Sequence, residues 1–436
     1  MRKAQIHIVG AGITGLVTAL MLSDSGISVV MSEAAAKSGG RIRTCDIYGW
    51  PVNLGPSWLH DGPENFLFQW LFERYMRSDK RHYDAKGIFR NIESNFILDT
   101  VNKAITITRE GISGNERRDA ARAWLDAQAE IVEGNGRRYS IGELVQGNKS
   151  AAAYFDYGAR NWAAIKDAFH YDYKEYAEDP TSDGGYQPVL GMEEMLAPML
   201  REIDGLGIPI HHNCPISQIA KHGNSYHLIG SQGQQFDAEH IVLAIPKPAL
   251  EKLVIDPPLT DSPHIVRALS DIQNSQMNKI IVPFESNFLA DAIEPNTHIR
   301  VLTAKPSHFS FARPAGSPFV FLFAGGDLAQ QAEQWDSQKV ADFVDDSLSR
   351  VPMLKGHKKF RTGAALVTKH HELFGCAYSA LRVGGERAGG PQIHDGRIIV
   401  ANADIVGLEQ SAGTLAGACH AGVATAKMTV AMCQNG

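Results

Sequence analysis

The segment Ile6-His7-Ile8-Val9-Gly10-Ala11-Gly12-Ile13-Thr14-Gly15, followed by Gly39-Gly40-Arg41-Ile42-Arg43-Thr44, decides the fold of this chain. The apolar run 6–9 predicts a buried parallel strand, and residues 16–22 predict an apolar helix directly after the glycines. In such a unit Gly10 permits a tight turn, Gly12 lets the backbone approach a pyrophosphate, and Gly15 lets helix and strand pack closely. The helix start at Ile13 and Thr14 offers N–H groups to that pyrophosphate. We therefore expect a dinucleotide site here, the alternative being a tight turn that holds no ligand.

An acid and an arginine narrow the choice of dinucleotide. A second predicted strand, 27–31, is followed by Glu33, which lies 23 residues after Gly10. An acid at about this distance accepts a hydrogen bond from a ribose 2′-hydroxyl, which favours NAD or FAD over NADP. Arg41, directly after Gly40, places a planar cation beside the same pyrophosphate, and this favours FAD. The alternative for Arg41 is a surface loop with the side chain in solvent.

The Gly39-Gly40-Arg41 element resembles that of the flavin-dependent amine oxidase superfamily, which includes monoamine oxidases, polyamine oxidases, L-amino acid oxidases and histone demethylases. The resemblance implies bound FAD, with Glu33 on the adenosine ribose and Arg41 and Arg43 near the phosphates. Periodicity alone gives only α/β segments. The resemblance adds an α/β fold in which a Rossmann-like FAD-binding domain of the glutathione-reductase type carries an inserted α+β substrate domain. The implied FAD domain is discontinuous (1–60, 184–260 and 391–436); the substrate domain takes 61–183, expected to be mainly helical, and 261–390.

Composition sets further limits. The 436 residues suggest two or three domains, and 44% hydrophobic with 21% charged residues is ordinary for a globular protein. A net charge of −6 provides no basic field for nucleic acid. The five cysteines are scattered without zinc-ligand spacing, so we expect free thiols and no metal. With no signal peptide or uncharged apolar span expected, the interpretation is a cytoplasmic protein without a membrane partner; a homodimer stays open.

Lys279 is the sharpest catalytic candidate. It opens the apolar run 280–282, so it should be partly buried, and a buried lysine is costly unless it is paired. The order Asn278-Lys279-Ile280-Ile281, continuing to Phe284-Glu285, resembles the superfamily segment whose lysine hydrogen-bonds a water at flavin N5. The resemblance implies that Lys279 places this water and assists reoxidation by O2. The alternative is a lysine at a strand start with its ammonium group in solvent.

The segment 53–60, Asn-Leu-Gly-Pro-Ser-Trp-Leu-His, resembles polyamine oxidases more than monoamine oxidases. The resemblance places Gly55, Pro56, Ser57 and Trp58 along the flavin and His60 against the substrate amine. Asp61 follows where the family usually has a glycine. The alternative is that Trp58 belongs to the core and His60 is an ordinary hydrogen-bonded histidine.

The segment Gly375-Cys376-Ala377-Tyr378-Ser379 resembles the element that places an aromatic ring before the flavin, which makes Tyr378 one wall of a substrate cage. Monoamine oxidases attach FAD through a cysteine directly before this tyrosine. Here that position is Ala377, and Cys376 stands one residue earlier. We therefore expect non-covalent FAD. The alternative for Tyr378 is a core aromatic.

Three further segments resemble FAD-contacting parts of the superfamily. Asp404, after the predicted strand 396–401, corresponds to an acid near the ribityl chain or the phosphates. Gly413 and Thr414 open the last helix, whose positive end faces the flavin pyrimidine ring. Ile216, in the middle of the chain, would meet the adenine through its backbone.

The function implied is that of an FAD-dependent amine oxidase. The amine loses a hydride from its α-carbon to flavin N5 and becomes an imine, and O2 is reduced to H2O2. An L-amino acid oxidase is the first alternative, with Arg160, Arg313 and Arg382 as candidates for binding a carboxylate. A dehydrogenase or desaturase that does not use O2 is the second. A non-catalytic carrier with the same fold is the third.

Overall fold

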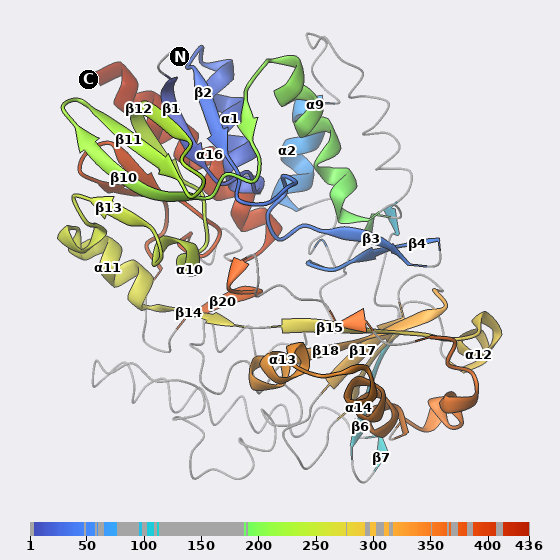
Figure 1. Ribbon diagram of the computed structural model, residues 1–436. Helices are drawn as coiled ribbons and strands as arrows, with labels where there is room; N and C mark the ends of the chain where they lie inside the picture. Colours follow the sequence, from blue (N-terminus) through green and yellow to red (C-terminus); the bar gives the residue numbers. More distant parts are fainter. Residues whose placement is uncertain are drawn as a thin grey trace, which may run out of the picture.

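The apolar run before the first glycine turn forms strand β1 (Ala4–Val9), which lies inside a sheet and pairs in parallel with β2 (Val29–Ser32) and β12 (Gln235–Leu243). Ile8 and Val9, whose side chains point to opposite faces of β1, are both buried, as expected for a strand covered on both faces. The computed structural model describes residues 4–47, 49–56, 59, 65–75, 96–97, 103–108, 111–112, 187–188, 191–275, 277–292, 297–301, 309–313, 317–349, 351–363, 366–367, 374–381, 387–406 and 413–435 (Figure 1).

In the described part of the chain, this sheet has nine strands. The order along the sheet is β13-β10-β11-β12-β1-β2-β9, with β22 also pairing with β12 and β21 pairing with β22. The remaining bounds are β9 (Ile210–His211), β10 (Ile216–His222), β11 (Ser225–Gly230), β13 (Val254–Asp256), β21 (Gln392–His394) and β22 (Ile398–Val400). Three distant parts of the sequence therefore form one sheet.

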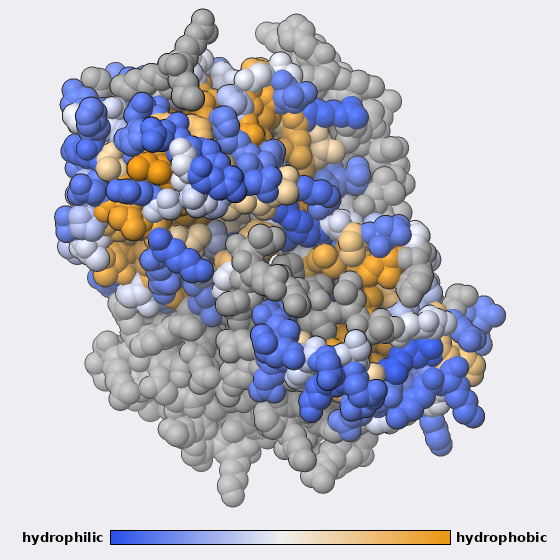
Figure 2. Space-filling view, in the orientation of Figure 1, coloured by the Kyte–Doolittle hydropathy of each residue, from blue (hydrophilic) through white to orange (hydrophobic). Residues whose placement is uncertain are grey.

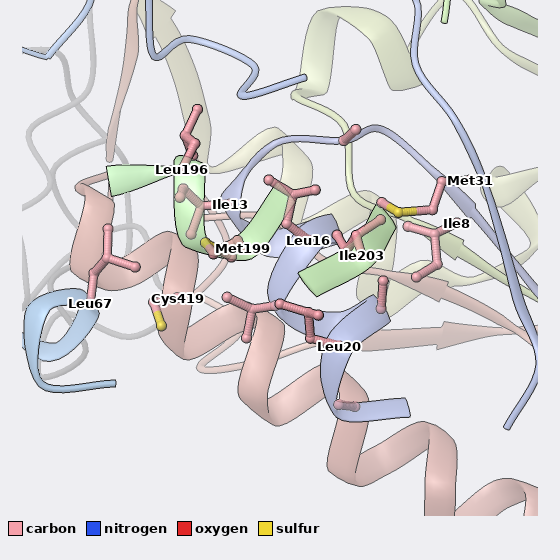
Figure 3. Packing of buried hydrophobic residues seen from close by; sticks show 14 of the residues in the cluster. Ile8, Ile13, Leu16, Leu20, Met31, Leu67, Leu196, Met199, Ile203 and Cys419 are labelled. Atoms are coloured by element: carbon pink, nitrogen blue, oxygen red, sulfur yellow. The ribbon is translucent and has the colours of Figure 1, made fainter. Parts of the chain in front are cut away.

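Helix α1 (Ile13–Asp24) packs directly on the last helix, α16 (Leu415–Asn435), and the small residues of α16 permit the close approach. A Cβ on Gly422 would lie 2.8 Å from the carbonyl oxygen of Thr14 and 2.7 Å from Cβ of Val17. The Thr14 hydroxyl donates to the carbonyl of Ala418 at 2.9 Å. Apolar side chains of β1, α1, α2 (Phe66–Tyr75) and α9 (Ala197–Gly205) fill the core around this helix pair (Figure 3).

A second sheet has seven strands in the described residues, in the order β19-β15-β18-β17-β16-β6-β7. Its strands are β6 (Lys103–Thr108), β7 (Gly111–Ile112), β15 (Met277–Pro283), β16 (Thr297–Val301), β17 (Phe309–Arg313), β18 (Phe319–Gly325) and β19 (Leu366–Val367). The prediction that 61–183 is mainly helical was wrong at Lys103–Thr108, which pairs in parallel with β16. The alternation in Lys-Ala-Ile-Thr-Ile-Thr, with β-branched residues, is the strand pattern that the helical interpretation overlooked.

Helices cover the second sheet on one side: α13 (Gly326–Glu333), α14 (Ser337–Ser349) and, at its end, α12 (Ser286–Ala292) (Figure 1). Val340, Val344 and Leu348 of α14 are buried in a core with Ile280 and Val282 of β15. The outer face of α14 is hydrophilic, as Figure 2 shows in the same orientation. Spacing of three to four residues between the buried side chains explains why this segment forms an amphipathic helix.

Two short ribbons lie between the sheets: the hairpin of β3 (Thr44–Ile47) and β4 (Trp50–Asn53), and the pair of β14 (Ile272–Ser275) and β20 (Tyr378–Leu381) (Figure 1). Val52 of the hairpin packs on Ile281 and Phe321 of the second sheet. A third ribbon pairs β5 (Phe96–Ile97) with β8 (Gln187–Pro188).

The segment 192–203 is divided into a 3₁₀ turn, η2 (Met192–Met195), and α9. Pro198 stands in the first turn of α9, where its missing N–H costs nothing. The other described helical segments are α10 (Lys247–Leu250), η3 (Leu259–Asp261), α11 (Pro263–Ser270), η5 (Pro352–Leu354) and η6 (His357–Lys359). No described helix is both long and apolar enough to span a bilayer.

Candidate active site

The first glycine turn joins β1 to α1 with backbone packed against backbone. Gly10 has a φ of +103°, and a Cβ there would lie 2.6 Å from the carbonyl oxygen of Ala244. A Cβ on Gly15 would lie 2.0 Å from the carbonyl oxygen of Gly10. Gly12 then precedes α1, whose start carries no side-chain cap. A helix that begins in this way offers the backbone N–H groups of its first turn, at Ile13 and Thr14, to an anion.

The second glycine turn lies directly on the first. Gly40 has a φ of +58°, and a Cβ on it would lie 3.3 Å from Cα of Gly12. The Gly39 N–H donates to the carbonyl of Ala11 at 2.8 Å. The two turns therefore form a narrow cradle lined by bare backbone, which a single methyl group would begin to fill.

Glu33 closes one end of this cradle. Its buried carboxylate accepts hydrogen bonds from the N–H groups of Ala11 and Ala35, both at 2.8 Å. The carbonyl of Glu33 accepts from the N–H of Cys214 at 2.9 Å, which brings the start of β10 at Ile216 to the same end. The ribose and adenine candidates, Glu33 and Ile216, are therefore neighbours.

Arg41 and Asp404 meet on the other side of the turns. Nη2 of Arg41 lies 3.8 Å from Oδ1 of Asp404, and Nη1 donates to the carbonyl of Ala377 at 3.2 Å. Burial lowers the pKa of Arg41, but the Asp404 carboxylate outweighs it and the net shift is upward. Arg43 differs, because its guanidinium donates to the carbonyls of Lys37, Ser38 and Ile42. Arg43 thus fixes its own loop, and a contact with phosphate has no support in this geometry.

Asp404 is fully buried after β22 and has one carboxylate oxygen to spare. Oδ1 accepts from the Ser379 hydroxyl at 2.8 Å, whereas Oδ2 has no hydrogen-bond partner among the described residues. A buried carboxylate oxygen without a partner is costly, so it indicates a ligand that donates to it. Gly413, with a φ of +76°, is close to Ser379 and donates to the carbonyl of Ala403 at 2.8 Å. Thr414 follows, and its hydroxyl accepts from the Gly417 N–H at 3.2 Å at the start of α16.

Lys279 is 4% exposed on β15 and reaches across to the end of β4 and the residues directly after it. Its Nζ donates to the carbonyl oxygens of Asn53 and Gly55, each at 2.5 Å, and lies 5.5 Å from the ring centre of Phe321. Burial lowers the pKa of Lys279 to about 7, against a smaller opposing effect of the Cys45 thiol. The alternative of an ammonium group in solvent is therefore wrong. Gly55 connects this lysine to the second glycine turn, because a Cβ on Gly55 would lie 1.9 Å from the carbonyl oxygen of Arg41.

Several predicted site residues cannot be placed in the same way. Ser57, Trp58 and His60 lie outside the described residues. Tyr378 is described for its backbone only, which pairs with Ser275 in the β14–β20 ribbon. Pro56 is described and partly buried directly after Gly55.

Sequence reasoning missed three polar contributors to this arrangement. Ser379 holds Asp404, Asn53 supplies an acceptor to Lys279, and the Cys45 thiol acts on the Lys279 ammonium group. Ser379 and Asn53 lie inside the segments 375–379 and 53–60 that resemble the superfamily. A serine or an asparagine in such a segment does not by itself indicate a role in the site. No cluster of potential metal ligands is present among the described residues.

Comparisons with known proteins show the family and the fold of this chain. The family model for flavin containing amine oxidoreductase matches residues 13–427. Probable polyamine oxidase 4 of Arabidopsis thaliana is 25% identical over 369 residues, which cover 78% of this chain and 70% of the relative. L-amino-acid oxidase of Gloydius blomhoffii is 24% identical over 389 residues, covering 80% and 73%. A solved structure of wild-type putrescine oxidase bound to putrescine has a TM-score of 0.72 at 15% identity, covering 98% of this chain and 99% of that one, which shows a shared fold.

Proposed function

Because this chain belongs to the family of flavin-containing amine oxidoreductases, we propose that it is an oxidase of polyamine-type amines that uses non-covalently bound FAD and passes the electrons to O2. When bound, FAD would accept a hydride from the α-carbon of the amine, and the amine would become an imine. The reduced flavin would then be reoxidised by O2, which is reduced to H2O2. The polyamine oxidase relatives and the shared fold with putrescine oxidase support this substrate class.

The described residues suit FAD at its pyrophosphate and its ribityl chain. The bare cradle of Gly12 and Gly40 leaves room for a pyrophosphate beside the start of α1, and Arg41 supplies a cation there. Oδ2 of Asp404, buried and without a partner among the described residues, suits a hydroxyl of the ribityl chain. Burial raises the pKa of the Cys376 thiol to about 11, so this side chain stays neutral. Since the thiolate is the reactive form of cysteine, a neutral Cys376 favours non-covalent FAD.

The observation that carries the proposal is the placement of Lys279. A buried lysine held by two carbonyl oxygens, next to the loop that begins at Gly55, is rigid and has a pKa near neutrality. Such a group can hold a water molecule and exchange a proton with it at physiological pH. We assign to Lys279 the ordering of the water and the proton supply during reaction with O2. Tyr378 and His60 are assigned to the substrate cage and the substrate amine.

An L-amino acid oxidase is the second candidate, favoured by the relative from Gloydius blomhoffii. It requires a cation for the substrate carboxylate. Of the three arginine candidates, Arg160 and Arg382 lie outside the described residues, and Arg313 is described for its backbone only. The two activities are therefore distinguished by the substrates that reduce the flavin, as in the following experiment.

The test begins with the visible spectrum of the purified protein, loaded with FAD where needed, before and after acid precipitation. We expect the yellow colour in the supernatant and anaerobic bleaching by polyamines, but not by amino acids. Bleaching by amino acids alone would select the second candidate, and bleaching without later peroxide formation would select a dehydrogenase. A protein that takes up no FAD would be a carrier.

The role of Lys279 is tested with Lys279→Met, which keeps length and removes the ammonium group. We expect slower reaction of the reduced protein with O2 while FAD stays bound. Lys252→Met, on the exposed surface, is the matched control. Unchanged O2 reaction in Lys279→Met would remove this assignment.

A further inference from the structure

The two residues whose carbonyl oxygens hold Lys279 differ in how their own positions are fixed. Gly55 has no side chain, whereas Asn53 is 1% exposed and its side chain is engaged from two directions. Oδ1 of Asn53 accepts from the Thr44 hydroxyl at 3.0 Å and from the Met192 N–H at 2.7 Å. The Asn53 residue is therefore fixed independently of its contact with Lys279.

These contacts tie together three distant segments. Thr44 and Asn53 are directly opposite each other in the β3–β4 hairpin, which explains their side-chain contact. The Thr44 hydroxyl oxygen also accepts from the Glu193 N–H at 3.2 Å, so the hairpin caps the start of η2 with two side chains. Gly191 permits this docking, because a Cβ on it would lie 2.3 Å from Cγ2 of Thr44. The hairpin is thus anchored to η2 and, through it, to α9.

We propose that Asn53 is the positioning residue of Lys279. Its anchored side chain holds its own backbone carbonyl, and hence Lys279 Nζ, in place beside the carbonyl of Gly55. The proposal rests on the proposed function only in assigning Lys279 to the reaction with O2.

The amide nitrogen of Asn53 can be replaced to test the proposal. Nδ2 is buried and has no hydrogen-bond partner among the described residues. Asn53→Asp therefore replaces this NH2 by oxygen without loss of a known hydrogen bond, while Oδ1 keeps both donors. The change adds a negative charge on the residue whose backbone carbonyl holds Lys279, and a nearby opposite charge raises the pKa of a lysine.

Besides the two carbonyl groups, a thiol and an aromatic ring lie near Lys279. On β3 the Cys45 thiol faces Lys279, and Glu193 and Asp46 act on Cys45 in turn. From β18 the neighbour is the apolar ring of Phe321. A carboxylate at position 53 would add a negative charge to these surroundings.

Two measurements follow the pKa of Lys279 without any amine. In the first, FAD-loaded protein is reduced chemically and mixed with O2 at a series of pH values. In the second, the Tm of the FAD-free protein is followed over the same pH range, with Lys279→Met as the reference that lacks the ionisation. For Asn53→Asp we expect the midpoint of the first profile to rise by about one pH unit or more. We also expect the part of the Tm profile that depends on Lys279 to shift in the same direction.

Asn224→Asp is the matched control, because it makes the same chemical change at an exposed turn. A folded, FAD-binding Asn53→Asp with the midpoint of the wild type would overturn the proposal. Should that variant not fold, Thr44→Val decides, since it removes the hydroxyl that holds Asn53, together with the acceptor for the Glu193 N–H. We then expect O2 reaction to slow several-fold at unchanged FAD affinity, and a wild-type rate would overturn the proposal. Since no amine is used, these outcomes are separate from the identity of the substrate.

Discussion

Arg41 and Asp404 form an ion-pair contact of 3.8 Å between the second glycine turn and the loop after β22. The side chain of Asp404 is 1% exposed and that of Arg41 is 25% exposed, so the pair joins a buried anion to a cation that a ligand can still reach. A buried carboxylate needs such a partner, because an isolated one would cost several kcal/mol, on the order of 5. The pair therefore offsets the burial of Asp404 and fixes the arginine beside the glycine turns.

Asp404→Asn should weaken FAD binding while the fold is retained. The amide oxygen can still accept from the Ser379 hydroxyl, but the NH2 group cannot accept a hydrogen bond where Oδ2 now stands. Loss of one hydrogen bond to a charged group costs about 1.5–3 kcal/mol, or roughly a 10- to 100-fold rise in Kd. Titration of the FAD-free protein, followed by flavin fluorescence, measures this, with exposed Asp261→Asn as the control. Equal affinities in both variants would show that Asp404 does not contact FAD.

Gly55→Ala should disrupt the loop that holds Lys279. The new Cβ would lie 1.9 Å from the carbonyl oxygen of Arg41, and since both partners are backbone, one loop has to move. We expect a loss of about 1–3 kcal/mol in the free energy of unfolding, together with weaker FAD binding. Gly390→Ala is the control, because nothing lies within 4 Å of a Cβ there. Urea denaturation of the two variants compares them, and equal stability would contradict the close approach.

Lys279 should make the stability of the FAD-free protein depend on pH. Its folded-state pKa is lowered to about 7 by burial, from an ordinary value of 10.5. Between these values the unfolded chain binds more protons, so the free energy of unfolding rises with pH. The cost of the buried ammonium group is thus fully present below the lower value and is relieved as the pH approaches the higher one. As the pH rises through this window, the Tm of the wild type should increase relative to the Tm of Lys279→Met. Parallel Tm profiles would mean that the pKa of Lys279 is not shifted by folding.

The nucleotide-binding turns could be predicted from the sequence because their signals are local. Gly10, Gly12 and Gly15 lie within six residues of one another, and Gly10 and Gly15 are required by backbone contacts that a Cβ would block. The burial of Lys279 was also predictable, since the strand after it is apolar. In both cases a short window contains the whole physical reason.

Contacts between distant segments could not be predicted in this way. Nothing around Asn53 indicates that its carbonyl meets a lysine 226 residues later, or that its side chain caps η2. Likewise, the sequence does not indicate that the Thr14 hydroxyl donates to the carbonyl of Ala418 on α16. This hydrogen bond forms because the two helices pack closely. The strand Lys103–Thr108 is a different case, because its alternating β-branched residues are a local signal that the helical prediction overlooked.

Arg74→Met should strongly destabilise the protein. Arg74 on α2 is buried between Glu202 of α9 and Asp24 at the end of α1, with its Nε 2.6 Å from Glu202 and its Nη1 2.7 Å from Asp24. Burial lowers the pKa of Arg74, but hydrogen bonds to these two carboxylates raise it further, so the guanidinium is charged. Removing one partner of a buried ion pair costs about 3–5 kcal/mol, because the Glu202 charge stays buried. The double variant Arg74→Met with Glu202→Gln removes both charges and should recover part of the loss in urea denaturation. A double variant with a lower free energy of unfolding than Arg74→Met would show that the unpaired Glu202 charge does not cause the destabilisation.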